Sequence, residues 1–362
     1  MGDILHALPA VTALRKAHPS WRIGWAVEPR WRALLQAAGE RVADEQGVRS
    51  GLCAASPVVD RLHLVPAKAW GKNPLSRQTR IEIGALRAEL REAQYEAVLD
   101  LQGSIRSGVL ARLSGCKRIV GSSEPWERPA RWLYTEQVET ASVHVVEQGV
   151  ELARAVAGDL LMPMLPWLPV DTEAEVWSEG LADRIEDFAR WKPVVLINPG
   201  AGWGAKRWPV ERYGAVAEAL SGLGMVVLVN AGPGEEALAA AVVAAARGLA
   251  TAVICSLEQL IAVMRRVSLV IAGDTGPLHL ACALGKPVVG IYGPTDPKRN
   301  GPYGSPFRVL RNPESRRDHR RLAQPEAGLL TISPERVIAA VLELAEGRGL
   351  DWESAGWGAR RT

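Results

Sequence analysis

The chain has 362 residues, of which 48% are hydrophobic and 23% are charged. Single hydrophobic cores usually stop growing at roughly 250–300 residues, so this length predicts two domains. The composition is that of an ordinary globular protein and excludes disordered, collagen-like and coiled-coil chains. With 43 Lys and Arg against 40 Asp and Glu, the net charge of +3 is too small to indicate a protein that wraps nucleic acid.

The cysteines and the hydropathy pattern bear on the compartment. Cys53, Cys116, Cys255 and Cys282 show no C-x-x-C spacing, and the sequence has neither a signal-peptide pattern nor a long apolar run. A cytoplasmic protein with reduced, packed cysteines fits best, without a transmembrane segment. No D-x-D pair and no His/Cys cluster with ligand spacing is present, so the sequence does not indicate a metal.

Along the chain, short apolar runs alternate with amphipathic helical patterns. The first helical pattern starts directly from Met1-Gly-Asp-Ile-Leu-His-Ala-Leu-Pro, with no strand before it. We expect strands at residues 96–100, 193–197, 225–229, 268–272 and 287–292. This alternation predicts an α/β fold with parallel sheets covered on both faces.

A proline-rich segment divides the chain into two halves. Residues 161–192 hold three prolines in Met162-Pro-Met-Leu-Pro-Trp-Leu-Pro169, which cannot continue a helix, and then a helical pattern. We expect domains at residues 1–168 and 175–334. A last helix should follow with Ser333 as N-cap and Pro334 at its first position, running to about Glu346. Residues 351–362 show no periodicity and are expected to be loose.

Three turns in the second half join a strand to a helix. Gly273-Asp-Thr-Gly-Pro-Leu-His-Leu280 leaves backbone N–H groups at a helix start, where a phosphate would bind, or else Asp274 caps that helix. Asn198-Pro-Gly-Ala-Gly-Trp-Gly-Ala-Lys-Arg-Trp-Pro209 combines glycines with Lys206 and Arg207, which suits a second phosphate contact or a solvated surface turn. In the third turn, residues 230–236, Glu235 either accepts ribose hydroxyls or favours the helix start. Open α/β sheets bind ligands at such strand ends.

Five motifs in this order and spacing carry a resemblance. They are Met1-Gly-Asp-Ile-Leu-His-Ala-Leu-Pro, Asp100-Leu-Gln-Gly103, Lys206-Arg-Trp-Pro209, Gly273-Asp-Thr-Gly-Pro-Leu-His279 and Tyr292-Gly-Pro-Thr-Asp-Pro297. Their combination resembles family 9 glycosyltransferases, the bacterial ADP-heptose:lipopolysaccharide heptosyltransferases. The first and last motifs, with Gly301-Pro-Tyr-Gly304, are similar to heptosyltransferase I, whereas Ala205-Lys-Arg-Trp-Pro209 is closer to heptosyltransferase II.

The resemblance implies a GT-B fold, in which two Rossmann-like domains flank a cleft. The first would bind the acceptor and be completed by the last helix, about residues 335–350, and the second would bind ADP-heptose. The implied reaction is an inverting, metal-independent transfer of heptose from ADP-L-glycero-D-manno-heptose to the Kdo or inner core of lipopolysaccharide, with no cofactor. Such an enzyme would be cytoplasmic and peripheral on the inner membrane, where it meets Kdo-lipid A.

Site residues follow from the same resemblance. Asp3 matches the proposed general base, and Lys206 is the second implied catalytic residue. The implied donor-binding residues are Gly200, Ala201, Gly202, Glu235, Asp274, Thr275, Gly276 and His279. Inversion requires one carboxylate to take the proton of the acceptor hydroxyl, while a cation and a helix N-terminus stabilise the leaving diphosphate.

The acceptor site is expected in the first half. The stretch from Arg61 to Arg80 holds several basic residues and no acid. The corresponding region of the family meets phosphate and carboxylate groups, which implies Lys68 and Lys72 as acceptor-binding residues, together with Gln102. Relatives carry an arginine where this chain has Ser123, so either Arg128 or Arg131 is expected to replace it or the acceptor differs; Arg128 is taken as the acceptor-binding residue. A solvated basic face is the alternative.

Other functions stay open on the sequence alone. A nucleotide-sugar epimerase or another GT-B transferase would share the two-domain plan, and a non-catalytic sugar-binding protein would use similar turns. One departure concerns the fold, because members of the family carry a β-strand before Met-Gly-Asp. We therefore expect the first sheet to lack its first strand.

Overall fold

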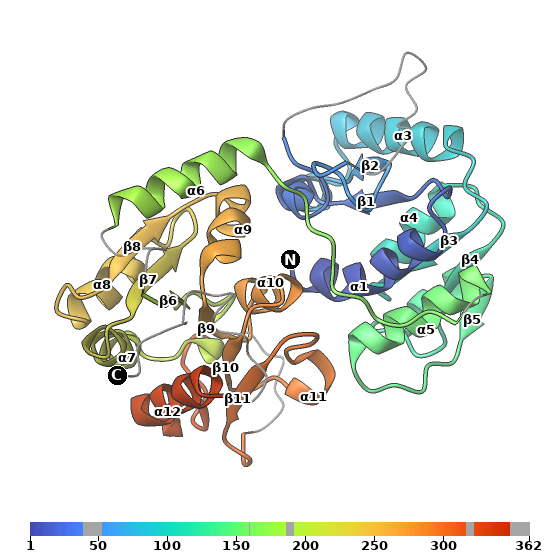
Figure 1. Cartoon of the computed structure of the whole chain (residues 1–362). Coiled ribbons are helices and arrows are strands. Elements are labelled where there is room, and N and C mark those ends of the chain that lie inside the picture. Colours follow the sequence, from blue (N-terminus) through green and yellow to red (C-terminus); the bar gives the residue numbers. More distant parts are fainter. Residues whose placement is uncertain (39–52, 159, 186–191, 316–321, 348–362) are drawn as a thin grey trace. The chain divides into compact units, whose positions relative to one another are not determined.

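A computed structural model of the chain describes residues 1–38, 53–158, 160–185, 192–315 and 322–347. Asp3–Pro169 and Val170–Thr362 form two compact α/β units, each with its own sheets and helices (Figure 1). The division falls directly after Pro169, the last of the three prolines in the connecting segment.

The first unit contains two short parallel sheets. Its helices, including the 3-10 turns, are α1 (Gly2–Ala17), η1 (Pro29–Leu34), α2 (Ala67–Lys72), α3 (Arg77–Glu92), α4 (Ile105–Leu113), η2 (Arg128–Leu133) and α5 (Val145–Ala157). Its strands are β1 (Gly24–Val27), β2 (Arg61–Leu64), β3 (Val98–Asp100), β4 (Ile119–Ser122) and β5 (Glu136–Val138). β1 pairs with β2, and β3, β4 and β5 form the other sheet in that order; no strand of the described residues joins the two sheets.

Helix α1 begins at Gly2 and runs through the interior of the first unit. Ala10, Ala13 and Leu14 pack against Val150 and Ala153 of α5. Burial on several sides fits an apolar sequence with a weak amphipathic pattern. The packing of this helix fixes its first turn, which carries Asp3.

The second unit is built on one six-stranded parallel sheet. Its strands are β6 (Val194–Asn198), β7 (Val226–Ala231), β8 (Thr251–Ile254), β9 (Leu269–Gly273), β10 (Val288–Tyr292) and β11 (Phe307–Arg311). Its helices and 3-10 turns are α6 (Thr172–Arg184), η3 (Gly204–Lys206), α7 (Val210–Gly222), α8 (Glu236–Ala245), α9 (Leu257–Arg266), α10 (Gly276–Ala283), α11 (Pro297–Asn300), η4 (Leu329–Thr331) and α12 (Pro334–Ala345). The strand order β8-β7-β6-β9-β10-β11 is that of the Rossmann fold.

The core of the second unit lies on the sheet face covered by α7, α8 and α12 (Figure 1). Alternate residues of the strands point to this face, among them Val195 and Ile197 of β6 and Ile271 of β9, and all three are buried. Both sheet faces are apolar because helices cover both, as the unbroken apolar runs predicted.

The expected strands are all present within one or two residues, and α1, α7, α10 and α12 begin where their patterns predicted. The linker is shorter than expected. Glu175 of α6 forms ion pairs with Arg265 and Arg266 of α9, so α6 belongs to the second unit and the connecting segment ends at Asp171.

The last helix departs from the expectation that it completes the first domain. Val337, Val341 and Leu344 of α12 pack into the core of the second unit, against α7 and the edge of the sheet. The apolar stripe of α12 is satisfied there, so this helix covers the second sheet. Ser333 is at the N-cap position, although its side chain makes no capping bond, and residues 351–362 lie outside the described part of the chain.

Candidate functional site

The site of the second unit lies where the strand order reverses. β6 and β9 are neighbours in the sheet, but the chain leaves them toward opposite sides. The loops that follow these two strands carry Lys206 and Asp274, so parallel pairing brings together residues that are far apart in the sequence. Doubly wound sheets bind their ligands at this switch point.

Lys206, Asp274 and His279 form a compact polar cluster. The Nζ of Lys206 lies 2.5 Å from Oδ2 of Asp274 and donates a second hydrogen bond to the Asp274 carbonyl at 3.2 Å. The Nε2 of His279 lies 3.1 Å from the other carboxylate oxygen. The Lys206 and Asp274 side chains are 11% and 8% exposed, and the ammonium group also lies 4.3 Å from the centre of the Trp203 ring.

The charges and hydrogen bonds of this cluster favour the ionised form of Asp274. Burial alone would raise the pKa of Asp274, but the hydrogen bond and charge of His279 and the charge of Lys206 outweigh it and hold the pKa well below its usual range. Both carboxylate oxygens are engaged by these side chains, so Asp274 does not cap the following helix. Its position fixes the ammonium group of Lys206 beside the start of α10.

The amino terminus of α10 leaves backbone N–H groups available. Thr275 is the N-cap residue, but its hydroxyl donates to the Gly273 carbonyl at 3.2 Å and makes no capping bond. Pro277 at the helix start has no N–H, and among the described side chains none accepts from the N–H of Gly276. Free N–H groups at the positive end of a helix dipole are suited to a phosphate.

The glycine-rich loop lies beside Glu235. The carboxylate oxygens of Glu235 lie 2.6 and 2.7 Å from the point where a Cβ would stand on Gly200, so only glycine permits this approach. Glu235 is half-buried, and its carboxylate has no hydrogen bond within the described part of the chain. It does not cap α8, which leaves it available as an acceptor for hydroxyl groups. Ala201 is buried and Gly202 is exposed in the same loop.

The loop also has supports that sequence reasoning missed. Asn198 donates from its amide to the Gly200 carbonyl at 3.2 Å, and Asn230 donates to the side-chain oxygen of Asn198 at 2.7 Å. The thiol of Cys255 donates to Asn230 at 3.4 Å, and burial raises the pKa of this thiol to about 12. A polar residue at the end of an apolar strand, as in Val-Val-Leu-Ile-Asn198, is the sequence signal that predicts a side chain supporting the following loop.

The expected residues of the first unit occupy several elements. Asp3 is exposed in the first turn of α1. Lys68 and Lys72 are four positions apart on α2, on one face, and both are exposed. Arg128, at the start of η2, is also exposed, and its Nη2 lies 3.9 Å from Glu124.

Gln102 is held in place through its backbone. The Oδ1 of Asp100 accepts the N–H groups of Gln102 and Gly103 at 2.9 and 3.0 Å, while Oδ2 accepts the hydroxyls of Ser107 and Tyr134. Burial and the Asp100 charge raise the pKa of Tyr134, so it remains a donor. Asp100 belongs to one of the five motifs, but the sequence alone indicated no role for it.

The second unit therefore assembles Lys206, Asp274, His279 and the α10 start at the adjoining ends of β6 and β9, with Glu235 in the loop after β7. This combination is typical of a phosphate-binding site in a Rossmann-type domain. Residues 83–329, more than half of the chain, match the model of glycosyltransferase family 9 (heptosyltransferase). The chain belongs to this family and is a glycosyltransferase.

Curated relatives and solved structures similar to this chain are heptosyltransferases too. Lipopolysaccharide heptosyltransferase 1 of Pseudomonas aeruginosa is 29% identical over 311 residues, covering 84% of this chain and 79% of the relative. Lipopolysaccharide heptosyltransferase 2 of Escherichia coli is 28% identical, covering 76% and 87%. The structure of Escherichia coli heptosyltransferase WaaC with ADP is 25% identical, with a TM-score of 0.72 and 96% of both chains covered. The expected α/β GT-B fold is confirmed.

The described residues were also compared with the patterns of metal sites and membrane-spanning helices. In the described ranges, no cluster of three or more His, Cys, Asp or Glu side chains has the arrangement of a metal site. None of the helices described is long and apolar enough to cross a membrane.

Proposed function

We propose that this glycosyltransferase moves heptose from ADP-L-glycero-D-manno-heptose to the Kdo or inner core of lipopolysaccharide. The observation that carries the proposal is the Lys206–Asp274–His279 cluster beside the free helix start at the switch point. Relatives named for heptose transfer, and a solved relative with bound ADP, support this donor. The acceptor is a lipid-linked sugar, so we place the enzyme at the cytoplasmic surface of the inner membrane.

Lys206 and the α10 start act on the leaving group. We assign the diphosphate of the donor to the N–H groups after Thr275, next to the ammonium group of Lys206. Negative charge grows on the diphosphate as its bond to the anomeric carbon breaks, and preformed donors stabilise that charge without reorganising. Asp274 and His279 hold Lys206 at this position, and Glu235 is assigned to the ribose hydroxyls.

Asp3 acts on the nucleophile. An acceptor hydroxyl attacks the anomeric carbon opposite the diphosphate, its proton passes to the Asp3 carboxylate, and ADP leaves with the bonding electrons. This single displacement inverts the anomeric configuration. The Asp3 carboxylate is exposed, so an incoming hydroxyl can reach it, as a general base requires. Lys68, Lys72, Gln102 and Arg128 are assigned to the anionic groups of the acceptor.

The test measures ADP release from ADP-heptose with Kdo-bearing lipid A, with the same acceptor already heptosylated, and without acceptor. Release that requires the Kdo-bearing acceptor, together with a product heavier by one heptose, is expected. Release that requires the heptosylated acceptor would instead assign the activity of heptosyltransferase 2. A chain that binds ADP but transfers nothing to either acceptor would contradict the proposal.

A further inference from the structure

The outer face of α3 carries small and apolar residues between exposed Arg77 at its start and exposed Glu92 at its end, and it is basic along one side. The helix buries only Thr79, Leu86 and Leu90. On the opposite side, Gly84 and Ala88 are exposed, and the Ile81 side chain is 55% exposed. Leu75, in the turn before the helix, is 84% exposed, the most open leucine but one among those described. Folding leaves these apolar groups in water.

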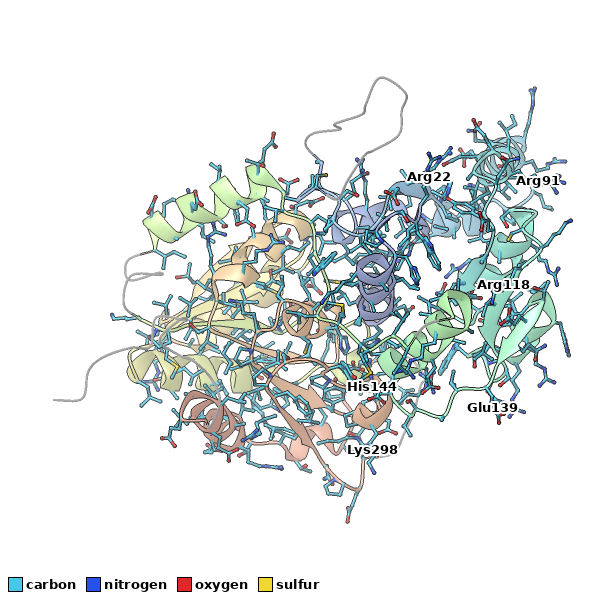
Figure 2. The ribbon with its side chains drawn as sticks, turned by 45° about the vertical axis from the view of Figure 1, so that its right-hand side comes forward. Arg22, Arg91, Arg118, Glu139, His144 and Lys298 are labelled. Carbon is cyan, nitrogen blue, oxygen red and sulfur yellow. The ribbon has the colours of Figure 1, made fainter. Side chains whose placement is uncertain are left out.

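A row of arginines flanks this apolar strip. Arg80, Arg87 and Arg91 follow each other at helical spacing on the same side of α3, and all three are exposed. Figure 2 shows Arg91 on this helix. None of the three lies within ion-pair distance of a carboxylate in the part of the chain that is described. Arg80 donates to the Leu75 carbonyl at 3.1 Å and so ties the turn to the helix.

Within the described part of the chain, the acidic residues of α3, unlike the three arginines, have charged or hydrogen-bonding side chains as partners. Glu82 accepts from the Trp70 indole and the Gln78 amide, both at 2.7 Å. Glu89 lies 2.6 Å from Nδ1 of buried His63 and 3.5 Å from Arg61, and Glu92 lies 3.9 Å from Arg61. Each acid thus contacts groups of its own unit on the other flank. The arginine row remains as charge directed to solvent, next to the exposed Leu75 and Ile81.

We propose that this face of α3, with Leu75 at its amino-terminal end, docks the protein on an anionic phospholipid surface. Basic side chains flanking an exposed apolar strip are the pattern of helices that lie in a membrane interface. Lipid phosphates complement the arginine row, and Leu75 and Ile81 bury their side chains among the acyl chains near the headgroups. The inference rests on the proposed function, because a lipid-linked acceptor brings the enzyme to a bilayer.

A lipid surface fits this face better than a protein partner does. Protein interfaces depend on a few large anchors in pockets, usually Trp, Tyr or Arg, surrounded by packed contacts. The arginines of the α3 face lie along its side, and its centre carries the small residues Gly84, Ala85 and Ala88, which offer no large anchor. A bilayer needs no shape complementarity, and it offers many phosphates to a row of cations.

The experiment measures co-sedimentation of the full chain with vesicles of phosphatidylethanolamine and phosphatidylglycerol, and with phosphatidylcholine vesicles. We expect binding to the anionic vesicles that weakens with salt, and little binding to the neutral ones. The triple variant Arg80→Gln, Arg87→Gln, Arg91→Gln should bind about 100-fold more weakly. Leu75→Ser should lose about 10-fold.

Matched controls change the same residue types in the second unit. The triple variant Arg184→Gln, Arg247→Gln, Arg336→Gln removes equal charge, and Leu223→Ser removes a leucine that is 57% exposed. Both should bind the anionic vesicles like the native chain. Equal weakening by both triple variants would overturn the α3 surface in favour of net charge. So would a dimer that is seen without lipid and lost in Leu75→Ser, since the face would then bind protein.

Transfer assays separate this inference from the proposed function. The transfer assay uses the double variant Arg87→Gln, Arg91→Gln, which keeps Arg80 of the expected acceptor region. With a deacylated, water-soluble Kdo acceptor, this variant should transfer heptose at the native rate, whereas transfer to an acceptor embedded in anionic vesicles should fall about 10-fold. Native transfer without vesicle binding would overturn the docking surface and leave the function standing. Vesicle binding that follows the α3 variants, without transfer to either acceptor, would support the docking surface and contradict the function.

Discussion

Asp274→Asn is the sharpest test of the cluster at the switch point. The substitution keeps the shape of the side chain but removes the charge that faces Lys206 at 2.5 Å. Breaking a buried ion pair from one side costs about 3–5 kcal/mol of unfolding free energy, because the remaining charge is left uncompensated. Lys206 keeps its bond to the residue 274 carbonyl and its contact with Trp203, so we expect the lower end, about 3 kcal/mol.

The assay is thermal and denaturant unfolding of the full chain. A loss of about 3 kcal/mol in a unit of this size lowers the melting temperature by about 6–12 °C. Asp183→Asn, on an exposed side chain of α6, is the matched control and should stay within about 0.5 kcal/mol of the native chain. A loss below about 1 kcal/mol in Asp274→Asn would refute the argument that this pair is strongly coupled.

The pH dependence gives a second check on the same variant. The folded pKa of Asp274 is held below its unfolded value, so its stabilisation is fully present above the unfolded pKa of about 3.9 and is lost as the pH falls through the lower folded pKa. The difference in unfolding free energy between the native chain and Asp274→Asn should be constant from about pH 8 to 5 and shrink below about pH 4. A step in that difference near neutral pH would assign the effect to another group.

Three further predictions concern catalysis and donor binding. Lys206→Ala should weaken ADP binding and lower turnover, since one cation serves both; titration calorimetry and steady-state rates check this, and unchanged ADP affinity would place the diphosphate elsewhere. Gly200→Ala should raise KM for the donor by about 10-fold, because a Cβ there would displace the Glu235 carboxylate, whereas Gly202→Ala has open space and should not. Asp3→Asn should leave ADP affinity unchanged and lower turnover by about 10²–10⁴. Full activity of Asp3→Asn would exclude it as the base.

Much of the fold of the second unit was predictable because its signals are local. Unbroken apolar runs such as Val-Val-Leu-Ile before Asn198 indicate strands covered on both faces, and Pro277 marks the first turn of a helix. The short strands of the first unit were harder to predict. β5, for example, spans Glu136–Val138, which is too brief for any alternation to show.

The candidate site was predictable in its residues and less so in its contacts. The motif resemblance named Lys206, Asp274 and His279, but the choice between a capping Asp274 and an ion-paired one needed coordinates. The Asn198–Asn230 support was missed because the two amides belong to different strands, and only the pairing of β6 with β7 brings them together.

The sequence by itself determined the alternation of strands and helices, the helix starts and the types of side chain that follow each strand, because propensity, capping and periodicity act over a few residues. Tertiary structure decided the strand order that joins the loops of β6 and β9, the packing of α12 in the second unit and the approach of Glu235 to Gly200. It also decided that the acids of α3 are engaged while its arginines face solvent. These outcomes depend on which surfaces meet across the fold, and no local pattern encodes that choice.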